Sequence, residues 1–317
     1  MMVRRYSHIG LCLIGVVVLG GICVFLARGQ RLEPAKRISL KSSIASPASF
    51  PKPTNKLKVA VAAIISPSRS LVFYEDIFDY IGEKLGQEVE MVQRKTYAEV
   101  NFLIEEGRID VAFVCSRPYV EGHRDFGMEL LCAPVCFGQA EYYSYFIVHK
   151  DSPIQTVDDL RGKVFAFSDP LSNTGMLVPA YVLAQRGETP ESFFRKYIFT
   201  YSHDNSIDSV AEKFVDAAAV DSLIWQYLNT REPARTAQTR IIYRSAPWAI
   251  PPVVVSPHIE PALKEKLRSA FLNMHEDVKG REILKKVLID RFTTIEDSAY
   301  DSIRQMEVFC QEFRSQP

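Results

Sequence analysis

The sequence predicts an α/β protein in which two lobes enclose a cleft. Apolar runs of strand length alternate with helical segments in two separate stretches of the chain, 57–115 and 164–220. This alternation is typical of parallel sheets covered by helices. Polar residues directly follow several of the apolar runs. Because ligands of open α/β sheets bind beyond the carboxyl ends of the strands, we expect a ligand site between the lobes.

The composition sets limits on the function. With 317 residues the chain can form one large core or two lobes of ordinary size. Lys and Arg together number 38, as do Asp and Glu, so the protein has no overall field that would recruit nucleic acid. The six cysteines show no paired spacing with histidines, which argues against a zinc site. We therefore expect buried free thiols, no metal and no cofactor.

The N-terminal residues read as a membrane segment followed by a tether. Arg4 and Arg5 precede residues 9–27, which are almost wholly apolar and about as long as the ~20 residues of a membrane span. We expect residues 1–28 to form an uncleaved anchor with the remainder outside the cytoplasm; a cleaved signal peptide or a lipidated Cys23 is the alternative. Residues 29–56 are rich in Ser, Pro and Lys and predict a flexible tether.

The first lobe begins at Leu57. The apolar run 57–65 predicts a strand covered on both faces, and Ser66 and Pro67 then open a helix. Strands are expected at 88–94 and 109–115, with a helix from 97 to 106 between them.

The second lobe begins with an aromatic and β-branched strand at 142–149. Further strands are predicted at 164–167, 196–203 and 216–220, and a helix at 207–214. Late strands near 241–243 and 253–255 flank a proline-rich return, and the chain ends in helices. This order predicts one lobe formed by 57–141 and 247–317, and a second formed by 142–246, joined by two crossing segments.

The stretch 164–179 carries the strongest local signal for a ligand. A short strand ends in turn residues and is followed by Ser172, Asn173 and Thr174 at the start of a helix that Gly187 closes. Backbone N–H groups and the positive end of the helix dipole then point to one place, which together with the two hydroxyls suits a small tetrahedral oxyanion. An ordinary helix cap would show the same residues.

Other polar residues share this placement at strand ends or helix starts. They are Ser66, Tyr97, Tyr119, Tyr142 and His203. Each has a structural alternative, such as a surface aromatic or a structural histidine, but together they would face one cleft. Ser172, His203 and Asp216 could also be read as a catalytic triad. Ser172 lacks the G-x-S-x-G elbow, however, so we do not predict a hydrolase.

Five segments resemble one family in its own order. They are GRIDVAFVCSRPYVEG, YYSYFIVHKDSPIQTVDDLRGK, FSDPLSNTGMLVP, YSHDNSIDSVAEKFVDAAAVDS and SAPWAIPPVVVSPHI. The region from about Leu57 to Met306 resembles the periplasmic substrate-binding proteins of phosphonate, phosphite and phosphate ABC transporters. The resemblance implies a type II periplasmic binding protein fold, with mixed sheets flanked by helices and two crossing strands.

The resemblance also implies roles for individual residues. Ser172, Asn173 and Thr174 match the loop that holds the phosphonate oxygens, and Tyr97 and Tyr142 match the family's tyrosines. The family histidine corresponds to His203 and an acidic residue to Asp216. Asn173 stands where members often have Thr, and the apolar segment 9–27 is atypical of secreted or lipid-anchored members.

We therefore expect a non-enzymatic binding protein that captures a phosphorus oxyanion on the periplasmic side of the inner membrane and delivers it to an ABC permease. The alternatives are a membrane-anchored sensor that signals to a histidine kinase or similar partner, and an enzyme built on the same fold.

Overall fold

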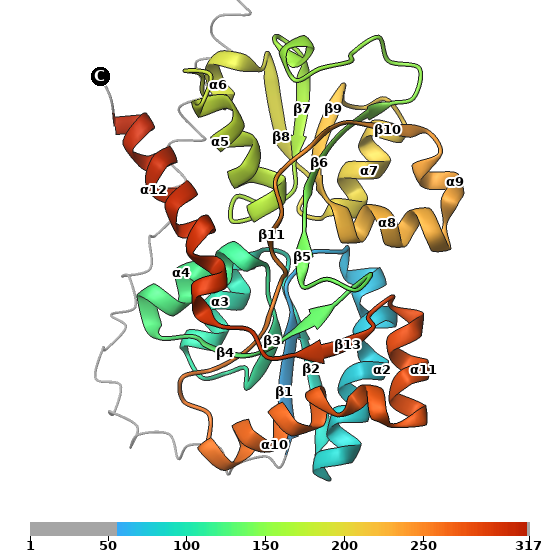
Figure 1. The fold of residues 1–317 in the computed structure, drawn as a ribbon, viewed down its shortest axis with the longest axis vertical. Coiled ribbons are helices and arrows are strands. Elements are labelled where there is room, and N and C mark those ends of the chain that lie inside the picture. The colour runs from blue at the N-terminus through green and yellow to red at the C-terminus, as the bar shows by residue number, and fades with distance from the viewer. Residues whose placement is uncertain (1–55, 316–317) are drawn as a thin grey trace, which may run out of the picture. The chain divides into compact units, whose positions relative to one another are not determined.

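The computed structural model describes residues 56–315, except for the side chains of residues 67–73 (Figure 1). The predicted anchor, and all of the predicted tether except its last residue, lie outside the described residues. Within the described part, no helix is both long and apolar enough to span a membrane.

The first lobe contains a six-stranded sheet with the order β13-β4-β12-β3-β1-β2. Its strands are β1 (Lys56–Val61), β2 (Glu88–Gln93), β3 (Val111–Phe113), β4 (Glu129–Val135), β12 (Val253–Val255) and β13 (Arg291–Thr293). The first three strands run parallel, whereas β12 pairs antiparallel with both β3 and β4. The late strand β12 therefore inserts into the middle of a sheet begun near residue 56.

Helices surround this sheet. They are α2 (Pro67–Leu85), α3 (Tyr97–Glu105), α4 (Ser116–Phe126), α10 (Pro261–Leu272) and α11 (Val278–Lys286), with short 3-10 turns at η3 (Met274–Glu276) and η4 (Asp297–Tyr300). The ring of Phe113 at the end of β3 contacts the rings of Phe78, Phe271 and Phe292. One aromatic side chain thus joins the central strand to α2, α10 and β13.

The second lobe contains a five-stranded sheet with the order β10-β6-β9-β7-β8. Its strands are β6 (Ser144–His149), β7 (Val164–Phe167), β8 (Lys196–Phe199), β9 (Ala217–Asp221) and β10 (Thr239–Arg244). Its helices are η1 (Asp158–Leu160), η2 (Asn173–Leu177), α5 (Val178–Ala184), α6 (Pro190–Phe193), α7 (His203–Ala211), α8 (Ser222–Arg231) and α9 (Pro233–Thr236). Strands β7, β8 and β9 are parallel, so their carboxyl ends lie at one edge of the sheet.

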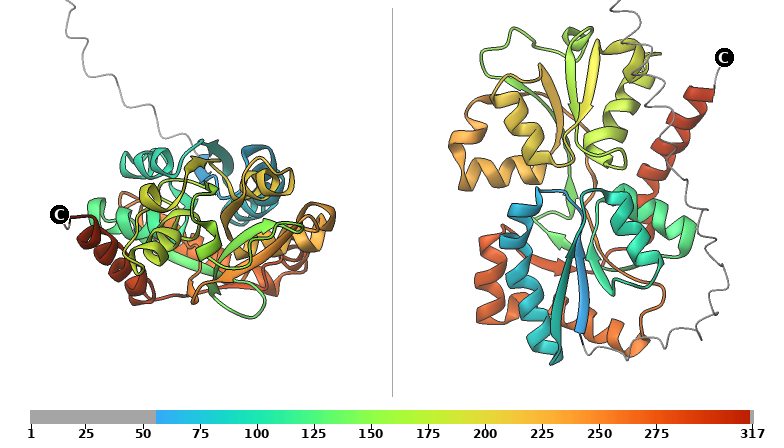
Figure 2. Two further views of the ribbon diagram at one scale, coloured as in Figure 1. Left: turned by 90° about the horizontal axis from the view of Figure 1, so that it is seen from above. Right: turned by 180° about the vertical axis from the view of Figure 1, so that it is seen from behind.

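Two segments join the lobes. Short strands β5 (Glu141–Tyr142) and β11 (Trp248–Ala249) form an antiparallel pair in which Tyr142 faces Trp248. Figure 1 shows this pair between the two sheets. The division into lobes at residues 142 and 247 stays a prediction. Helix α12 (Asp301–Ser315) extends from the first lobe to α5 of the second, where the Phe309 and Tyr181 ring centroids are 5.1 Å apart (Figures 1 and 2).

Several predicted elements have different bounds in the structure. The strand predicted over 196–203 ends at Phe199, because Tyr201 has a left-handed φ of 61° and Ser202 caps α7. His203 is therefore the first residue of a helix and not the last of a strand. The strand predicted over 142–149 is divided at Tyr143, which separates β5 from β6.

Candidate functional site

The loop after β7 folds tightly onto its own strand. The backbone N–H of Ser168 donates to the carbonyl of Gly175 at 3.3 Å. A Cβ at Gly175 would lie 1.9 Å from Oγ of Ser168 and 3.0 Å from Cε1 of His203. Only glycine permits this approach, so Gly175 holds the loop against both β7 and α7.

Ser172 caps the helix that follows. Its Oγ accepts a hydrogen bond from the Gly175 N–H at 3.0 Å, and the helix then opens with the wide π turn η2 before continuing as α5. The same Oγ lies 3.5 Å from Nε2 of His203. Ser172 is therefore a helix cap, and its hydroxyl hydrogen remains available as a donor in a buried position.

The backbone fixes the protonation state of His203. The N–H of Asp221 donates to Nδ1 of the imidazole at 3.0 Å, so Nδ1 carries no proton. Complete burial lowers the pKa of His203 to about 3, and the ring is neutral at pH 7. Nε2 must then carry the hydrogen and act as a donor toward Ser172. A histidine in this state cannot accept a proton from the serine, which argues against the triad.

Tyr142 and Cys115 lie beside Asn173 and, with Tyr97, Ser172, Thr174 and His203, form a buried polar cluster. Nδ2 of Asn173 donates to the Tyr142 hydroxyl at 3.0 Å, and Sγ of Cys115 lies 3.8 Å from the same oxygen. Burial raises the pKa of Tyr142 and of Tyr97 well above that of free tyrosine, and raises the pKa of Cys115 to about 11. These groups are neutral at pH 7 and can serve as hydrogen-bond donors.

Three polar atoms in this cluster are buried without a hydrogen-bond partner among the described residues. They are the Tyr97 hydroxyl, Oγ1 of Thr174 and Oδ1 of Asn173, each in a residue with 0% exposure. Buried polar atoms are normally paired, so an unpaired group calls for an explanation. Turning the Asn173 amide over would present an N–H donor at its unpaired position. The arrangement then suits a ligand rich in acceptor oxygens.

Ser66 belongs to the first lobe and forms hydrogen bonds to a residue of the second lobe. Its hydroxyl donates to Oδ2 of Asp204 at 2.6 Å and its N–H donates to Oδ1 at 2.9 Å. In the same way, the N–H of Tyr97 at the start of α3 donates to Oδ2 of Asp169 at 3.2 Å. Carboxylates from the second lobe thus lie at the N-termini of two first-lobe helices, where the helix dipoles favour negative charge.

Tyr119 and Asp216 do not join the cluster. The Tyr119 hydroxyl donates to Asp297 at 2.5 Å, and its ring packs on Tyr300 beside η4. Asp216 precedes β9, and its Oδ2 accepts from the N–H of Val164 at 2.7 Å. Since Val164 begins β7, Asp216 lies at the amino ends of the parallel strands, opposite the edge that carries Ser172.

Asp221 is the acid that the structure brings to the site, and the sequence reasoning missed it. It is the last residue of β9, is 1% exposed, and accepts from the N–H of Leu223 at 2.7 Å. Burial raises the pKa of Asp221 to about 7. Its position directly after the apolar run AAAV was the signal that could have identified it.

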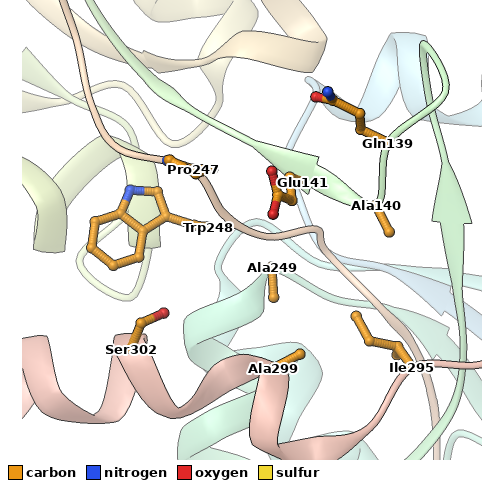
Figure 3. A pocket seen from close by; sticks show the side chains of 9 residues that line it. All are labelled: Gln139, Ala140, Glu141, Pro247, Trp248, Ala249, Ile295, Ala299 and Ser302. Atoms are coloured by element: carbon orange, nitrogen blue, oxygen red, sulfur yellow. The ribbon is translucent and has the colours of Figure 1, made fainter.

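No group of His, Cys, Asp or Glu within the described part of the chain could hold a metal ion. The four cysteines of this part are buried and free. A pocket of about 640 Å³ lies between the crossing segments and the start of α12. Figure 3 shows Glu141, Trp248 and Ser302 among the residues that line it.

Comparison with known proteins identifies the family. Residues 59–300 match the family described as "ABC transporter, phosphonate, periplasmic substrate-binding protein". The chain belongs to this family. The resemblance seen in the sequence is thereby confirmed, and so is a function in substrate binding for an ABC transporter.

The phosphonates-binding periplasmic protein of Escherichia coli K12 is 24% identical over 273 residues, which cover 84% of this chain and 80% of that protein. A probable ABC transporter phosphite binding protein of Prochlorococcus marinus is 26% identical over 178 residues, 52% of this chain and 60% of the relative. The crystal structure of a binding protein component of an ABC phosphonate transporter from Pseudomonas aeruginosa superposes with a TM-score of 0.78 at 23% identity, covering 82% and 88% of the two chains. These comparisons confirm the two-lobed fold.

Proposed function

We propose that the chain captures a phosphorus oxyanion at the cluster formed by Ser172, Asn173, Thr174, His203 and the two tyrosines Tyr97 and Tyr142. The observation that carries this proposal is the set of three unpaired buried atoms on Tyr97, Asn173 and Thr174. They surround the start of the η2–α5 helix and come from both lobes. A tetrahedral oxyanion would accept from the hydroxyl, phenol and imidazole donors that converge there.

The site would bind the anion without an ion pair. Among the described residues at the cluster the donors are neutral, since Tyr97, Tyr142 and His203 are uncharged at pH 7. Neutral donors suffice because a hydrogen bond to an ionised acceptor is roughly twice as strong as one between neutral groups. The relatives include a phosphonate-binding and a phosphite-binding protein, which bind compounds that differ in the substituent on phosphorus. The experiment below therefore compares ligands with different substituents.

Contacts between the lobes support a cycle of opening and closing. Arg117 in α4 donates to the carbonyl of Pro170 at 2.9 Å, and its Nε donates to Glu307 at 2.7 Å. Pro170 belongs to the loop that leads to Ser172. Opening the cleft would break this contact and those of Asp169 and Asp204, and a bound anion would favour the closed form that a permease recognises.

Titration calorimetry on the full-length chain tests the proposal. Phosphate, phosphite, methylphosphonate and aminoethylphosphonate should be compared, with sulfate as an oxyanion that lacks phosphorus. At least one phosphorus compound should bind more tightly than sulfate, and replacing Thr174 by Val should weaken that binding. Equal affinity for sulfate, or full affinity in the Thr174→Val variant, would overturn the assignment.

We further propose that the protein acts at the outer face of the inner membrane, held there by residues 9–27. Family membership supports the periplasmic location. The apolar composition of residues 9–27, which lie outside the described residues, supports the anchor. No observation on the described residues favours a sensor that signals to a kinase.

A further inference from the structure

The C-terminal helix α12 contacts both lobes. Near its start in the first lobe, Arg304 forms an ion pair with Asp297 of η4. The Tyr300 hydroxyl, at the end of η4, donates to the carbonyl of Ile250 at 2.9 Å. Farther along, α12 packs against η2 and α5 of the second lobe (Figures 1 and 2). Because η2 and α5 follow the cap Ser172, the last helix of the chain reaches the element that presents the proposed oxyanion site.

Arg117 connects three parts of the molecule. Its Nη1 donates to the carbonyl of Pro170, in the loop before Ser172, at 2.9 Å. Its Nε donates to Oε1 of Glu307 on α12 at 2.7 Å. Its Nη2 forms an ion pair with Oε1 of Glu121, one turn along α4, at 3.0 Å. Each nitrogen of this guanidinium therefore has a different partner, and the partners lie in the second lobe, in α12 and in α4.

The shape of the guanidinium makes the direction of Nη1 depend on the two carboxylates. The group is planar, and its N–H donors form a rigid fork. When Glu307 holds Nε and Glu121 holds Nη2, the direction of Nη1 is determined, and Nη1 then points at the carbonyl of Pro170. Without Glu307, the Arg117 side chain would keep its contact with Glu121 but could rotate away from Pro170.

The buried carboxylate of Glu307 calls for an explanation. Its side chain is 5% exposed, so its partners must replace the water that it loses on folding. Arg117 contacts it directly, and Nη1 of Arg124 lies 3.8 Å from its Oε2. Apolar side chains of the same volume often stabilise a protein as well as a buried ion pair does, and the best-attested use of such a pair is to specify one arrangement. Stability alone therefore does not account for a carboxylate on this face of α12.

The position of Pro170 affects residues of the proposed site. The preceding residue, Asp169, accepts from the N–H of Tyr97 in the first lobe at 3.2 Å and from the N–H of Leu171 at 2.8 Å. The carbonyl of Asp169 accepts from the N–H of Ser172 at 2.9 Å. A displacement of the Pro170 carbonyl would therefore disturb hydrogen bonds to both Tyr97 and Ser172.

We propose that Glu307 is a positioning residue for ligand binding. Through Arg117 it holds residues 168–172, the Ser172 loop, in the arrangement that binds the oxyanion. This inference rests on the proposed function. The hydrogen bond from Arg117 to Pro170 joins the two lobes, so it is present only when they are closed. It stabilises the closed form that the ligand binds, and its loss should reduce affinity.

Two substitutions of Glu307 separate positioning from stability. Glu307→Gln removes the charge and keeps the shape, whereas Glu307→Met provides an apolar side chain of similar volume, which should leave the melting temperature without ligand nearly unchanged. Calorimetry on the full-length chain with methylphosphonate, phosphite and phosphate should show affinity about fivefold or more weaker in both variants, as expected for the loss of one hydrogen bond. Glu312→Gln makes the same charge change at an exposed position of α12 and should keep wild-type affinity. Wild-type affinity in either Glu307 variant would overturn the inference.

Substitutions of Arg117 test whether Glu307 acts through it. Arg117→Lys keeps a positive charge beside Glu307 but loses the fork, so it should weaken binding about as much as Arg117→Met does. Adding Glu307→Gln to Arg117→Met should cause no further loss of affinity. Wild-type affinity in Arg117→Lys, or a full additional loss in the double variant, would overturn the inference, because a simple ion pair or another route would then explain the effect of Glu307. If none of the phosphorus compounds binds the wild-type chain, the proposed function fails, and this inference fails with it.

Discussion

At the scale of single residues, the donor and acceptor roles of each group determine what the cluster can bind. The backbone N–H of Asp221 determines which nitrogen of His203 is protonated, and the ring then presents a donor to Ser172. Ser172 in turn accepts from Gly175 and keeps its own hydrogen for a further acceptor. His203 and Gly175 both donate to Oγ of Ser172, so the serine hydrogen is free to donate to a ligand. This arrangement does not pass a proton from serine to histidine, but it is suited to binding an anion.

Single substitutions at this cluster should reduce affinity more than stability. A hydrogen bond to a charged acceptor contributes about 1.5–3 kcal/mol, so Ser172→Ala and His203→Gln should each lose roughly 10- to 150-fold in affinity. Loss of a helix cap typically costs only ~1 kcal/mol of folding free energy. Calorimetry and thermal melting of the same samples separate the two effects. Unchanged affinity with a lowered melting temperature would show that Ser172 is only a cap.

The Asp221 carboxyl should make stability depend on pH. Its pKa is raised in the folded protein from 3.8 to about 7, so the folded state binds the proton more tightly than the unfolded state does. The stabilisation is complete below about pH 4 and is lost as the pH rises through 7, with an upper bound of about 4 kcal/mol at about 1.4 kcal/mol per pKa unit.

Replacement of this carboxyl isolates its contribution. Asp221→Asn should raise the melting temperature at pH 8 and change it little at pH 5, whereas Asp216→Asn should show no such difference. Other titratable groups near Asp221 are Tyr74, Tyr97, Cys115, Cys136, Tyr142, Tyr145 and His203. None of these groups titrates between pH 5 and 8, because burial raises the pKa values of the tyrosines and cysteines and lowers the pKa of His203 to about 3. An equal effect of Asp221→Asn at both pH values would contradict the raised pKa.

The structure brings together most of the residues that the sequence predicts for the site, but it places Asp221, and not Asp216, at the carboxyl ends of the parallel strands. Asp216 and Asp221 flank the same apolar run, and only the second follows it in the chain direction. Motif resemblance favoured Asp216, whereas the direction of a parallel strand favours Asp221. Tyr119 shows a different limit of sequence-based prediction. Its place near the start of a helix could be predicted, but the direction of its side chain depends on packing. The side chain contacts Tyr300 and Asp297 and does not reach the cluster.

At the scale of elements, the loop between β7 and α5 positions the site. Its turn residues and its helix start could be predicted, because proline and capping residues stop a strand. The π turn η2 and the helical position of His203 could not, because they depend on contacts with other elements. The backbone N–H of His203 donates to the carbonyl of Ile64 in the first lobe at 3.0 Å, a contact that local sequence does not encode.

Gly175 offers a test of this element. A methyl group at this position would overlap Oγ of Ser168 and press on His203, so Gly175→Ala should shift the loop and weaken oxyanion binding by about tenfold or more, with about 1–3 kcal/mol of lost stability from overpacking. The double variant Ser168→Gly/Gly175→Ala removes the closest clash and should recover part of both losses. Wild-type affinity in the single variant would show that the loop position does not control binding.

At the scale of the whole molecule, the N-terminal segment should decide where the protein is found. Residues 9–27 are long and apolar, and Phe25, Leu26 and Ala27 match a cleavage site poorly. We expect the protein in the membrane fraction of cells, with peptides from residues 1–30 detected by mass spectrometry of the native chain. A mature N-terminus near Gln30, or a lipid on Cys23, would contradict an uncleaved anchor.

The two crossing segments should allow the lobes to move. Tyr142 belongs both to the crossing β5 and to the oxyanion cluster, and it pairs with Trp248 in β11. The indole N–H of Trp248 donates to Oγ of Ser245 at 3.1 Å. A ligand that draws the lobes together should therefore change the environment of the Trp248 side chain.

The chain has two tryptophans, so a Trp225→Phe variant leaves Trp248 as the single fluorescent reporter. A saturating phosphorus oxyanion should change its emission, reduce the radius of gyration in X-ray scattering and raise the melting temperature, because the ligand binds the closed folded state. Ser172→Ala should require more ligand for the same changes, since the crossing is untouched and only affinity falls. A raised melting temperature with unchanged scattering and emission would show that the ligand binds without closure, and the contacts of Asp169 and Asp204 would then be permanent features of the fold.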